Sequence, residues 1–154
     1  MDEIDRNIVV ALQDDGSSGL AELAKVAGLS VSATAERVKR LEERGVIRAW
    51  RAELDPASVG CPLLAHVLAV VAPGQDDAGF REAMLQAEAV LECHAVSGAW
   101  TYLLKLRVAD LPALDTFLNG ALRALPGVQR VETIVAIATV KESATLPVAP
   151  AEEE

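Results

Sequence analysis

Residues 20–41 read LAELAKVAGLSVSATAERVKRL, and this stretch decides the fold of the first third of the chain. Two short patterns with helical spacing of apolar residues meet at Gly28-Leu29-Ser30, and the second pattern ends in arginines and lysine. Glycine is favoured directly after a helix and serine directly before one. The stretch predicts helices over about 20–27 and 31–44 joined by a tight turn. Such a helix-turn-helix places its second helix in the major groove of DNA.

The flanking residues predict the rest of this domain. Residues 2–14 have apolar residues on one helical face and acidic residues at the start, which suits the positive end of a helix. Residues 46–54, VIRAWRAEL, alternate apolar and polar side chains and predict a strand. Proline and glycine interrupt the pattern after that. We therefore expect a winged-type helix-turn-helix domain with a connecting strand over 1–54, followed by a linker over 55–62.

The second half of the chain alternates strand and helix patterns. Strand patterns cover 63–71, 90–96, 101–108 and 128–140, and helix patterns cover 77–88 and 111–125. The order βαββαβ is that of the ferredoxin-like split motif. The sequence thus predicts an α+β protein whose C-terminal domain, 63–142, is ferredoxin-like (ACT-like). Prolines and three terminal glutamates predict a disordered acidic tail over 143–154.

Composition restricts the class of protein. The 154 residues are 51% hydrophobic but only 3% aromatic, and the net charge is −9, which excludes a protein that coats nucleic acid over its whole surface. Residues 37–51, however, hold six basic residues against two acidic ones. A local basic patch suits a specific DNA binder. The start of the chain lacks a signal-peptide pattern and no apolar run is long enough for a membrane span, so a cytoplasmic protein without membrane partners is expected.

The sequence offers no catalytic or metal-binding pattern. Cys61 and Cys93 are far apart and belong to no CxxC or His/Cys spacing. Cys93 and His94 are adjacent strand residues, whose side chains point to opposite faces, so they do not share a metal easily. We expect no enzyme activity, no metal and no cofactor.

The candidate DNA contacts lie on and just before the second helix of the motif. The hydroxyl and basic side chains there suit phosphates and base edges. They are Ser30, Ser32, Thr34, Arg37, Lys39 and Arg40. Alternatives stay open: the cations pair with glutamates on a solvated helix face, and the hydroxyls are only helix caps or small buried groups. Arg48 and Arg51 suit either DNA backbone or a dimer seam.

Four segments together resemble the leucine-responsive/AsnC regulators, also called feast/famine proteins. The resemblance covers about 2–141 and rests on the order and spacing of DEIDRNIV, LAELAKVAGLSVSATAERVKRLEERGVIRAWRAELDP, ECHAVSGAWTYLLKLRVADL and LPGVQRVETIVAIATVK. It implies an N-terminal helix-turn-helix, a connecting strand and a ferredoxin-like domain that senses amino acids. It also implies dimers that assemble further, often to octamers, and bind effectors between dimers.

The resemblance places a small-molecule effector at one loop and one strand position. The residues it implies are Ser97, Gly98, Ala99, Trp100, Thr101 and Thr133. Many family members carry an acidic residue at the position of Thr101, and some at the position of Ala99. A carboxylate there forms an ion pair with an amino group, whereas Thr101 offers only a hydrogen bond. Three alternatives therefore stay open: a different effector, weaker binding of the effector, or no effector.

Together these observations predict a sequence-specific DNA-binding transcription regulator. Its partners are double-stranded DNA, a small molecule that is most simply an amino acid, and further copies of itself. The alternative is an effector-independent architectural protein that wraps or bridges DNA. A metal- or thiol-responsive regulator is a third possibility.

Overall fold

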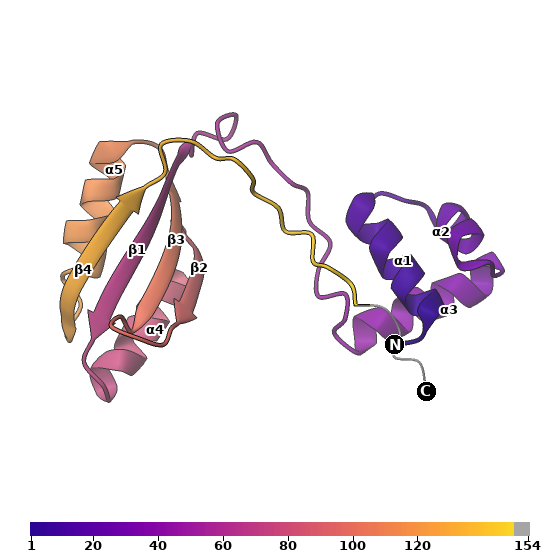
Figure 1. The fold of residues 1–154 in the computed structure, drawn as a ribbon, viewed down its shortest axis with the longest axis horizontal. Coiled ribbons are helices and arrows are strands. Elements are labelled where there is room, and N and C mark those ends of the chain that lie inside the picture. The colour runs from indigo at the N-terminus through magenta and orange to yellow at the C-terminus, as the bar shows by residue number, and fades with distance from the viewer. Residues whose placement is uncertain (150–154) are drawn as a thin grey trace. The chain divides into compact units, whose positions relative to one another are not determined.

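The computed structural model describes residues 1–149 (Figure 1). The chain divides into two compact units. The first is Met1–Glu53 together with the C-terminal segment that begins at Lys141, and the second is Leu54–Val140. The end of the predicted acidic tail, residues 150–154, lies outside the described residues.

The first unit is built on three helices, α1 (Glu3–Asp14), α2 (Leu20–Ala27) and α3 (Val31–Glu43). These match the three helices that the sequence predicts. Ile8 of α1, Ala27 of α2 and Leu41 of α3 are at most 9% exposed and form one apolar cluster. Each helix therefore contributes a buried residue to a small common core, as the apolar stripe of an amphipathic helix requires.

The turn between α2 and α3 has the predicted geometry. Gly28 adopts φ 65° and ψ 30°, a left-handed conformation in which glycine has no steric penalty. Its N–H and that of Leu29 return to the carbonyl of Ala24 and close the end of α2. Ser30 then caps α3, because its side chain accepts a hydrogen bond from the Ala33 N–H at 3.2 Å. The angle between the two helices is thus set within three residues.

The predicted strand over 46–54 is wrong, and with it the winged form of the domain. Val46 and Ile47 donate back to the carbonyl of Leu41, which continues the end of α3. Trp50 Nε1 donates to Glu42 Oε1 at 2.7 Å, so the segment lies against α3. The alternating pattern is present, but a strand needs a partner strand, and residues 1–149 provide none for this segment.

The second unit contains a four-stranded antiparallel sheet in the order β2-β3-β1-β4. Its elements are β1 (Leu63–Val71), α4 (Gln75–Gln86), β2 (Val90–Ala95), β3 (Tyr102–Val108), α5 (Leu111–Thr116), the π-helical turn η1 (Phe117–Leu122) and β4 (Val128–Val135). The first and third strands of the chain lie in the centre. This is the ferredoxin-like arrangement predicted from the sequence.

Two predicted elements of this unit differ from the structure. The helix pattern over 111–125 is α-helical only to Thr116 and then widens into η1. Gly120 lies in the wide turn, where a residue of low helix propensity tolerates departure from α geometry. The last strand ends at Val135 instead of 140. Beyond Ala136, which still donates to the Leu64 carbonyl, the chain extends past the end of β1 and loses its pairing partner.

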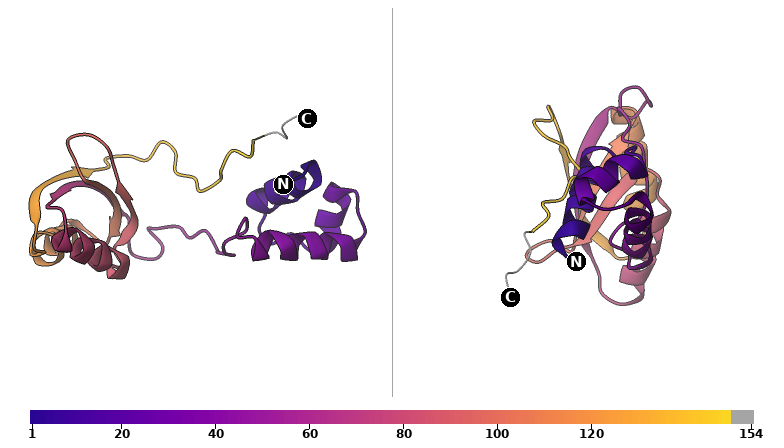
Figure 2. Two further views of the ribbon diagram at one scale, coloured as in Figure 1. Left: turned by 90° about the horizontal axis from the view of Figure 1, so that it is seen from below. Right: turned by 90° about the vertical axis from the view of Figure 1, so that its right-hand side faces the viewer.

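The two faces of the sheet have different surroundings. Alternate residues of the central strands, including Val67, Leu104 and Leu106, are fully buried beneath α4, α5 and η1. Figure 2 shows these helices on one side of the curved sheet. The other face carries Leu68, Leu103 and similar side chains in cross-strand register with no helix over them. We call this surface the open sheet face.

Residues 141–149 form no helix or strand, yet they are not detached from the fold. Gln13 and Arg6 of α1 hydrogen-bond to the backbone of Leu146 and Ala149. Two long polar side chains of α1 thus satisfy backbone groups of this segment. The disorder that composition predicts for the tail stays a prediction.

Candidate functional site

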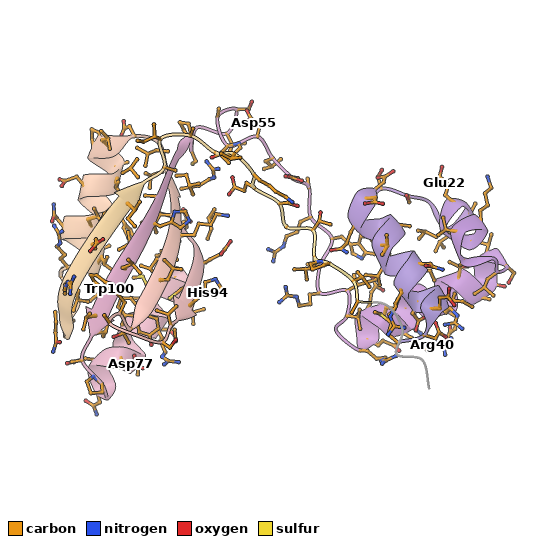
Figure 3. The ribbon with its side chains drawn as sticks, viewed as in Figure 1. Glu22, Arg40, Asp55, Asp77, His94 and Trp100 are labelled. Atoms are coloured by element: carbon orange, nitrogen blue, oxygen red, sulfur yellow. The ribbon has the colours of Figure 1, made fainter. Side chains whose placement is uncertain are left out.

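Helix α3 presents a set of exposed polar side chains beyond the turn. Ser32 is exposed, and its Oγ lies 3.1 Å from Ser30 Oγ. Lys39 and Arg40 are 67% and 58% exposed, and each has a glutamate one turn away, at 3.7 and 4.0 Å. Exposed pairs of this kind contribute little stability, so both cations exchange partners easily. Figure 3 labels Arg40 on this helix.

Thr34 does not belong to this exposed set, which corrects its prediction as a DNA contact. It is fully buried, and its Oγ1 donates to the Ser30 carbonyl at 3.0 Å. Serine and threonine side chains in helices commonly donate a hydrogen bond in this way to the backbone carbonyl four residues earlier. The second reading of the sequence, a small buried residue, is the one that fits the structure.

Arg37 does not belong to the exposed side chains of α3 either. Its Nη1 lies 2.7 Å from Asp2 Oδ2 and 2.7 Å from Asp5 Oδ1, and its side chain is only 22% exposed. Asp2 is in addition the N-cap of α1, where it accepts from the Asp5 N–H at 2.8 Å. That backbone bond and the Arg37 guanidinium hold the pKa of Asp2 below its usual value. We call Arg37, Asp2 and Asp5 the α1–α3 clamp.

Next to the clamp lies a shallow hollow of about 260 Å³. Its lining combines the clamp with further cations of α3 and the start of the chain. The residues are Met1, Asp2, Asp5, Arg37, Arg40, Leu41 and Arg44. Three guanidinium groups and the amino terminus face two carboxylates there. Since Arg37 already pairs with both carboxylates, the excess positive charge lies at Arg40 and Arg44.

The predicted effector loop connects β2 to β3. Gly98 adopts φ 108°, which L side chains rarely reach, although a Cβ there meets no neighbour. Glycine is therefore favoured at this position by the backbone conformation and not by a lack of space for a side chain. Ser97 and Ala99 are exposed beside it. Thr101 anchors the end of the loop: its N–H donates to the Ala69 carbonyl at 2.9 Å, and its Oγ1 accepts from the Val71 N–H at 3.2 Å.

Trp100 and Arg130 form a stacked pair at this loop. The Arg130 guanidinium carbon lies 4.1 Å from the centre of the Trp100 ring, within the range of a cation–π contact. The Arg130 side chain is 62% exposed, and its Nη2 lies 3.9 Å from Glu132 Oε2, a loose surface contact that a ligand carboxylate can replace. A planar guanidinium held over a ring binds a carboxylate in a fixed geometry. Figure 3 labels Trp100.

Thr133 is not brought together with Trp100 within one chain. It pairs with Val67, which faces the helices, whereas Arg130 is an odd number of residues away and faces the opposite side. Thr133 Oγ1 is buried and lacks a hydrogen-bond partner in residues 1–149. Such a group gains from a ligand or a neighbouring chain that satisfies it. Within one chain, the structure contradicts a single site built from the loop and Thr133.

The cysteines and histidines do not assemble a centre. Cys61 and Cys93 are free thiols, and burial raises the pKa of Cys93, which opposes formation of a reactive thiolate. His94 Nε2 lies 3.2 Å from Glu92 Oε2, and that contact together with Lys105 keeps the pKa of Glu92 low. Within residues 1–149, no group of three or more His, Cys, Asp or Glu side chains is arranged to hold a metal ion.

Sequence reasoning missed three residues of these sites. Asp2 and Asp5 pair with Arg37 across two helices, and the i,i+4 glutamates on α3 were the expected partners instead. The sequence did hold one signal for this contact: Asp2 and Asp5 are acidic residues at the start of α1, and α1 packs against α3. Arg130 of β4 contacts Trp100 of the loop between β2 and β3, and no local spacing predicts that contact.

The helix-turn-helix and the ferredoxin-like domain define a class: transcription regulators with a separate ligand-binding domain. Family models agree. An AsnC-type helix-turn-helix domain matches residues 1–42, and an Lrp/AsnC ligand binding domain matches residues 66–146. The chain belongs to the Lrp/AsnC family of transcription regulators.

Individual relatives support this assignment. The leucine-responsive regulatory proteins of Klebsiella pneumoniae and Escherichia coli K12 are each 41% identical over 145 residues, covering 93% of this chain and 88% of the relative. Among solved structures, a transcriptional regulator of Neisseria meningitidis in complex with L-Met matches with a TM-score of 0.91 and 29% identity, covering 96% of both chains. The leucine response regulatory protein of Mycobacterium tuberculosis matches with a TM-score of 0.82 and 35% identity, over 95% of this chain and 99% of that one.

No helix in the described range, residues 1–149, is both long and apolar enough to cross a membrane.

Proposed function

We propose that the chain is a sequence-specific DNA-binding regulator of transcription whose α3 enters the major groove. The observation that carries this proposal is the turn at Gly28, which sets the direction of α3 relative to α2. Ser32, Lys39 and Arg40 are exposed on α3. Ser30 contributes its exposed hydroxyl near the N-terminus of α3. Lys39 and Arg40 contact phosphates, and residues nearer the N-terminus of α3 approach base edges. Thr34 and Arg37 act through packing and the α1–α3 clamp.

The second part of the proposal is a small-molecule effector, an amino acid, that binds at the loop of residues 97–101. A relative is known in complex with L-Met, and others are leucine-responsive regulators. In this chain Arg130, stacked on Trp100, is the group that takes the effector carboxylate. Neither Ala99 nor Thr101 offers a carboxylate to the amino group of the effector. We therefore expect weaker binding than in a protein with an acidic residue in this loop.

The third part is assembly into a homodimer and then into an octamer. The open sheet face carries half-buried apolar residues of central strands with no covering layer, among them Leu68, Val70 and Leu103. Lys105 and Glu92, 3.3 Å apart, lie at its margin. An antiparallel sheet with an apolar uncovered face gains from packing on a second sheet. We propose that this face joins two copies.

The test of DNA binding uses the salt dependence of affinity. Arg40→Ala removes one phosphate contact and reduces the slope of log K against log salt by about 0.9. The matched control is Arg123→Ala, an exposed arginine of the second unit, which leaves affinity and slope unchanged. An unchanged slope in Arg40→Ala removes this residue from the interface, and absence of binding by the wild type refutes the proposal.

A second candidate function has one observation in its favour. Thr101 directs both its N–H and its Oγ1 to backbone groups of β1, which leaves the loop no acidic ligand for an ammonium group. A protein without an effector that wraps or bridges DNA through its oligomer fits this loop as well. Thermal unfolding with each amino acid distinguishes the two: a shift supports the sensor, and a flat response supports the architectural protein.

Three further expectations complete the proposal. The chain acts without catalysis and without a cofactor, because its relatives are transcription regulators. It acts in the cytoplasm, where its DNA target lies. Replacement of both Cys61 and Cys93 by serine leaves DNA binding intact, and loss of binding or of its regulation would favour a thiol-responsive regulator instead.

A further inference from the structure

The hollow beside the α1–α3 clamp is lined by two arginines that lie outside the clamp. Arg37 binds both carboxylates of the lining, Asp2 and Asp5, at 2.7 Å each. Within residues 1–149, neither Arg40 nor Arg44 forms an ion pair with either of these carboxylates. Two cationic side chains therefore line a hollow of about 260 Å³ whose acidic groups are already engaged.

Arg40 and Arg44 lie one turn apart on the same side of α3, about 6 Å along its axis. Arg40 has one ion pair, with Glu36 Oε1 at 4.0 Å, and Arg44 is exposed with no ion pair in residues 1–149. Like charges at this spacing destabilise a helix. The negative end of α3 stabilises each of these cations singly, but it does not relieve the repulsion between them. An anion bound between the two arginines would relieve it.

The hollow lies on one flank of the helix that the proposed function places in the major groove. Ser32 and Lys39 are exposed on the side of α3 opposite the buried Leu41. Arg40 and Arg44 lie between these two sides, since successive residues turn by about 100° around the axis. A helix about 10–12 Å across fills a major groove about 12 Å wide, so its flanks meet the sugar–phosphate backbone that borders the groove. The flank that carries the hollow therefore faces phosphates instead of base edges.

We propose that this hollow seats the DNA backbone, with Arg40 and Arg44 each bound to one of two neighbouring phosphates. The inference rests on the proposed function and deepens it, because it assigns a DNA contact to Arg44 and places the backbone beside the start of α1. A guanidinium binds a phosphate through paired N–H donors of fixed geometry. Two such contacts, one turn apart, also fix the angle at which α3 meets the backbone.

The experiment measures the salt dependence of affinity for the DNA upstream of the protein's own gene. Arg44→Ala should lower the slope of log K against log salt by about 0.9, and R40A/R44A should lower it by about 1.8, one step for each phosphate. Between about 50 and 200 mM salt, the affinity of Arg44→Ala should then fall about 3.5-fold less than that of the wild type. Arg44→Lys keeps the charge and should retain most of the slope. Arg123→Ala makes the same change in net charge in the second unit, and this matched control should bind like the wild type.

An unchanged slope in Arg44→Ala, with a lowered slope in Arg40→Ala, overturns the inference and leaves the proposed function intact. An equally lowered slope in Arg123→Ala also overturns it. A second measurement separates DNA from free phosphate: unfolding of the first unit, followed by Trp50 fluorescence in a Trp100→Phe background, in sodium phosphate and in sodium chloride of equal ionic strength. If phosphate stabilises the wild type more than Arg44→Ala while the slope is unchanged, the hollow takes free anions and not DNA, which overturns the inference. If the wild type does not bind the duplex, the proposed function fails and the inference fails with it.

Discussion

Arg37 is the cationic residue of α3 whose replacement should act through stability instead of through DNA contact. Arg37→Ala leaves Asp5, whose side chain is 12% exposed, without its partner at 2.7 Å. A hydrogen bond to a largely buried charged group is worth about 1.5–3 kcal/mol. Asp2 adds little, because its side chain is 53% exposed and solvent screens the pair. The expected loss is therefore about 2 kcal/mol in the free energy of unfolding of the first unit.

A loss of this size is large for so small a unit. At about 0.1 kcal/mol per residue, some fifty residues hold about 5 kcal/mol. About 2 kcal/mol then lowers the midpoint of thermal unfolding by about 10 °C. Trp50 lies in this unit and Trp100 in the other, so fluorescence of Trp50 in a Trp100→Phe background reports the transition of interest.

The matched control is Arg40→Ala on the same helix, whose guanidinium is 58% exposed and 4.0 Å from Glu36. It should change the free energy of unfolding by less than about 0.5 kcal/mol. The salt dependence of DNA binding should show the reverse pattern, with Arg40→Ala lowering the slope and Arg37→Ala retaining it. If Arg37→Ala unfolds like Arg40→Ala and lowers the slope, the clamp is not structural and Arg37 is a DNA contact.

Four further changes test separate parts of the structure. Gly28→Ala should cost about 1 kcal/mol in the first unit, because φ is 65° there, and an unchanged denaturation midpoint would contradict the turn geometry. Gly127→Ala should destabilise the second unit by about 2 kcal/mol or more, measured by Trp100 fluorescence, since φ is 78° and a Cβ there collides with the Asp76 side chain. Gly98→Asp should alter effector response or oligomer size, measured by sedimentation, while circular dichroism shows the helices of the first unit intact; wild-type behaviour in both would remove the loop from the site. The Tyr102 hydroxyl and the Arg81 guanidinium lower the pKa of Asp77. The contribution of Asp77 to stability is therefore complete above about pH 4 and declines as the pH falls through the lowered pKa. Asp77→Asn should flatten the dependence of the free energy of unfolding on acid pH, and an unaltered pH profile would contradict this.

The sequence was sufficient where structure depends on neighbours along the chain. The Gly28 turn, a serine cap at Ser30 or Ser32 and the chain order of strands and helices in the second unit follow from local spacing. The structure has the turn and the order, and it uses Ser30 as the cap. The pattern of residues 46–54 is equally local and predicted a strand. It failed because strand formation depends on a partner segment, which periodicity does not report.

The site residues divide in the same way. Lys39 and Arg40 were predicted to be exposed from helical position alone, and they are. Arg37 has the same charge and lies on the same helix, but its role depends on where α1 lies against α3. Likewise, the contact of Arg130 with Trp100 joins residues thirty positions apart. Long-range pairs of this kind require the fold before the chemistry can be assigned.

The most direct test of the account is the affinity of the full-length protein for the DNA upstream of its own gene, at fixed salt, with and without each amino acid. The account predicts tight binding that at least one amino acid shifts, and loss of that shift in Arg130→Ala with DNA binding retained. Tight binding that no amino acid alters would contradict the sensing role of the second unit. Absence of binding would contradict the role of α3.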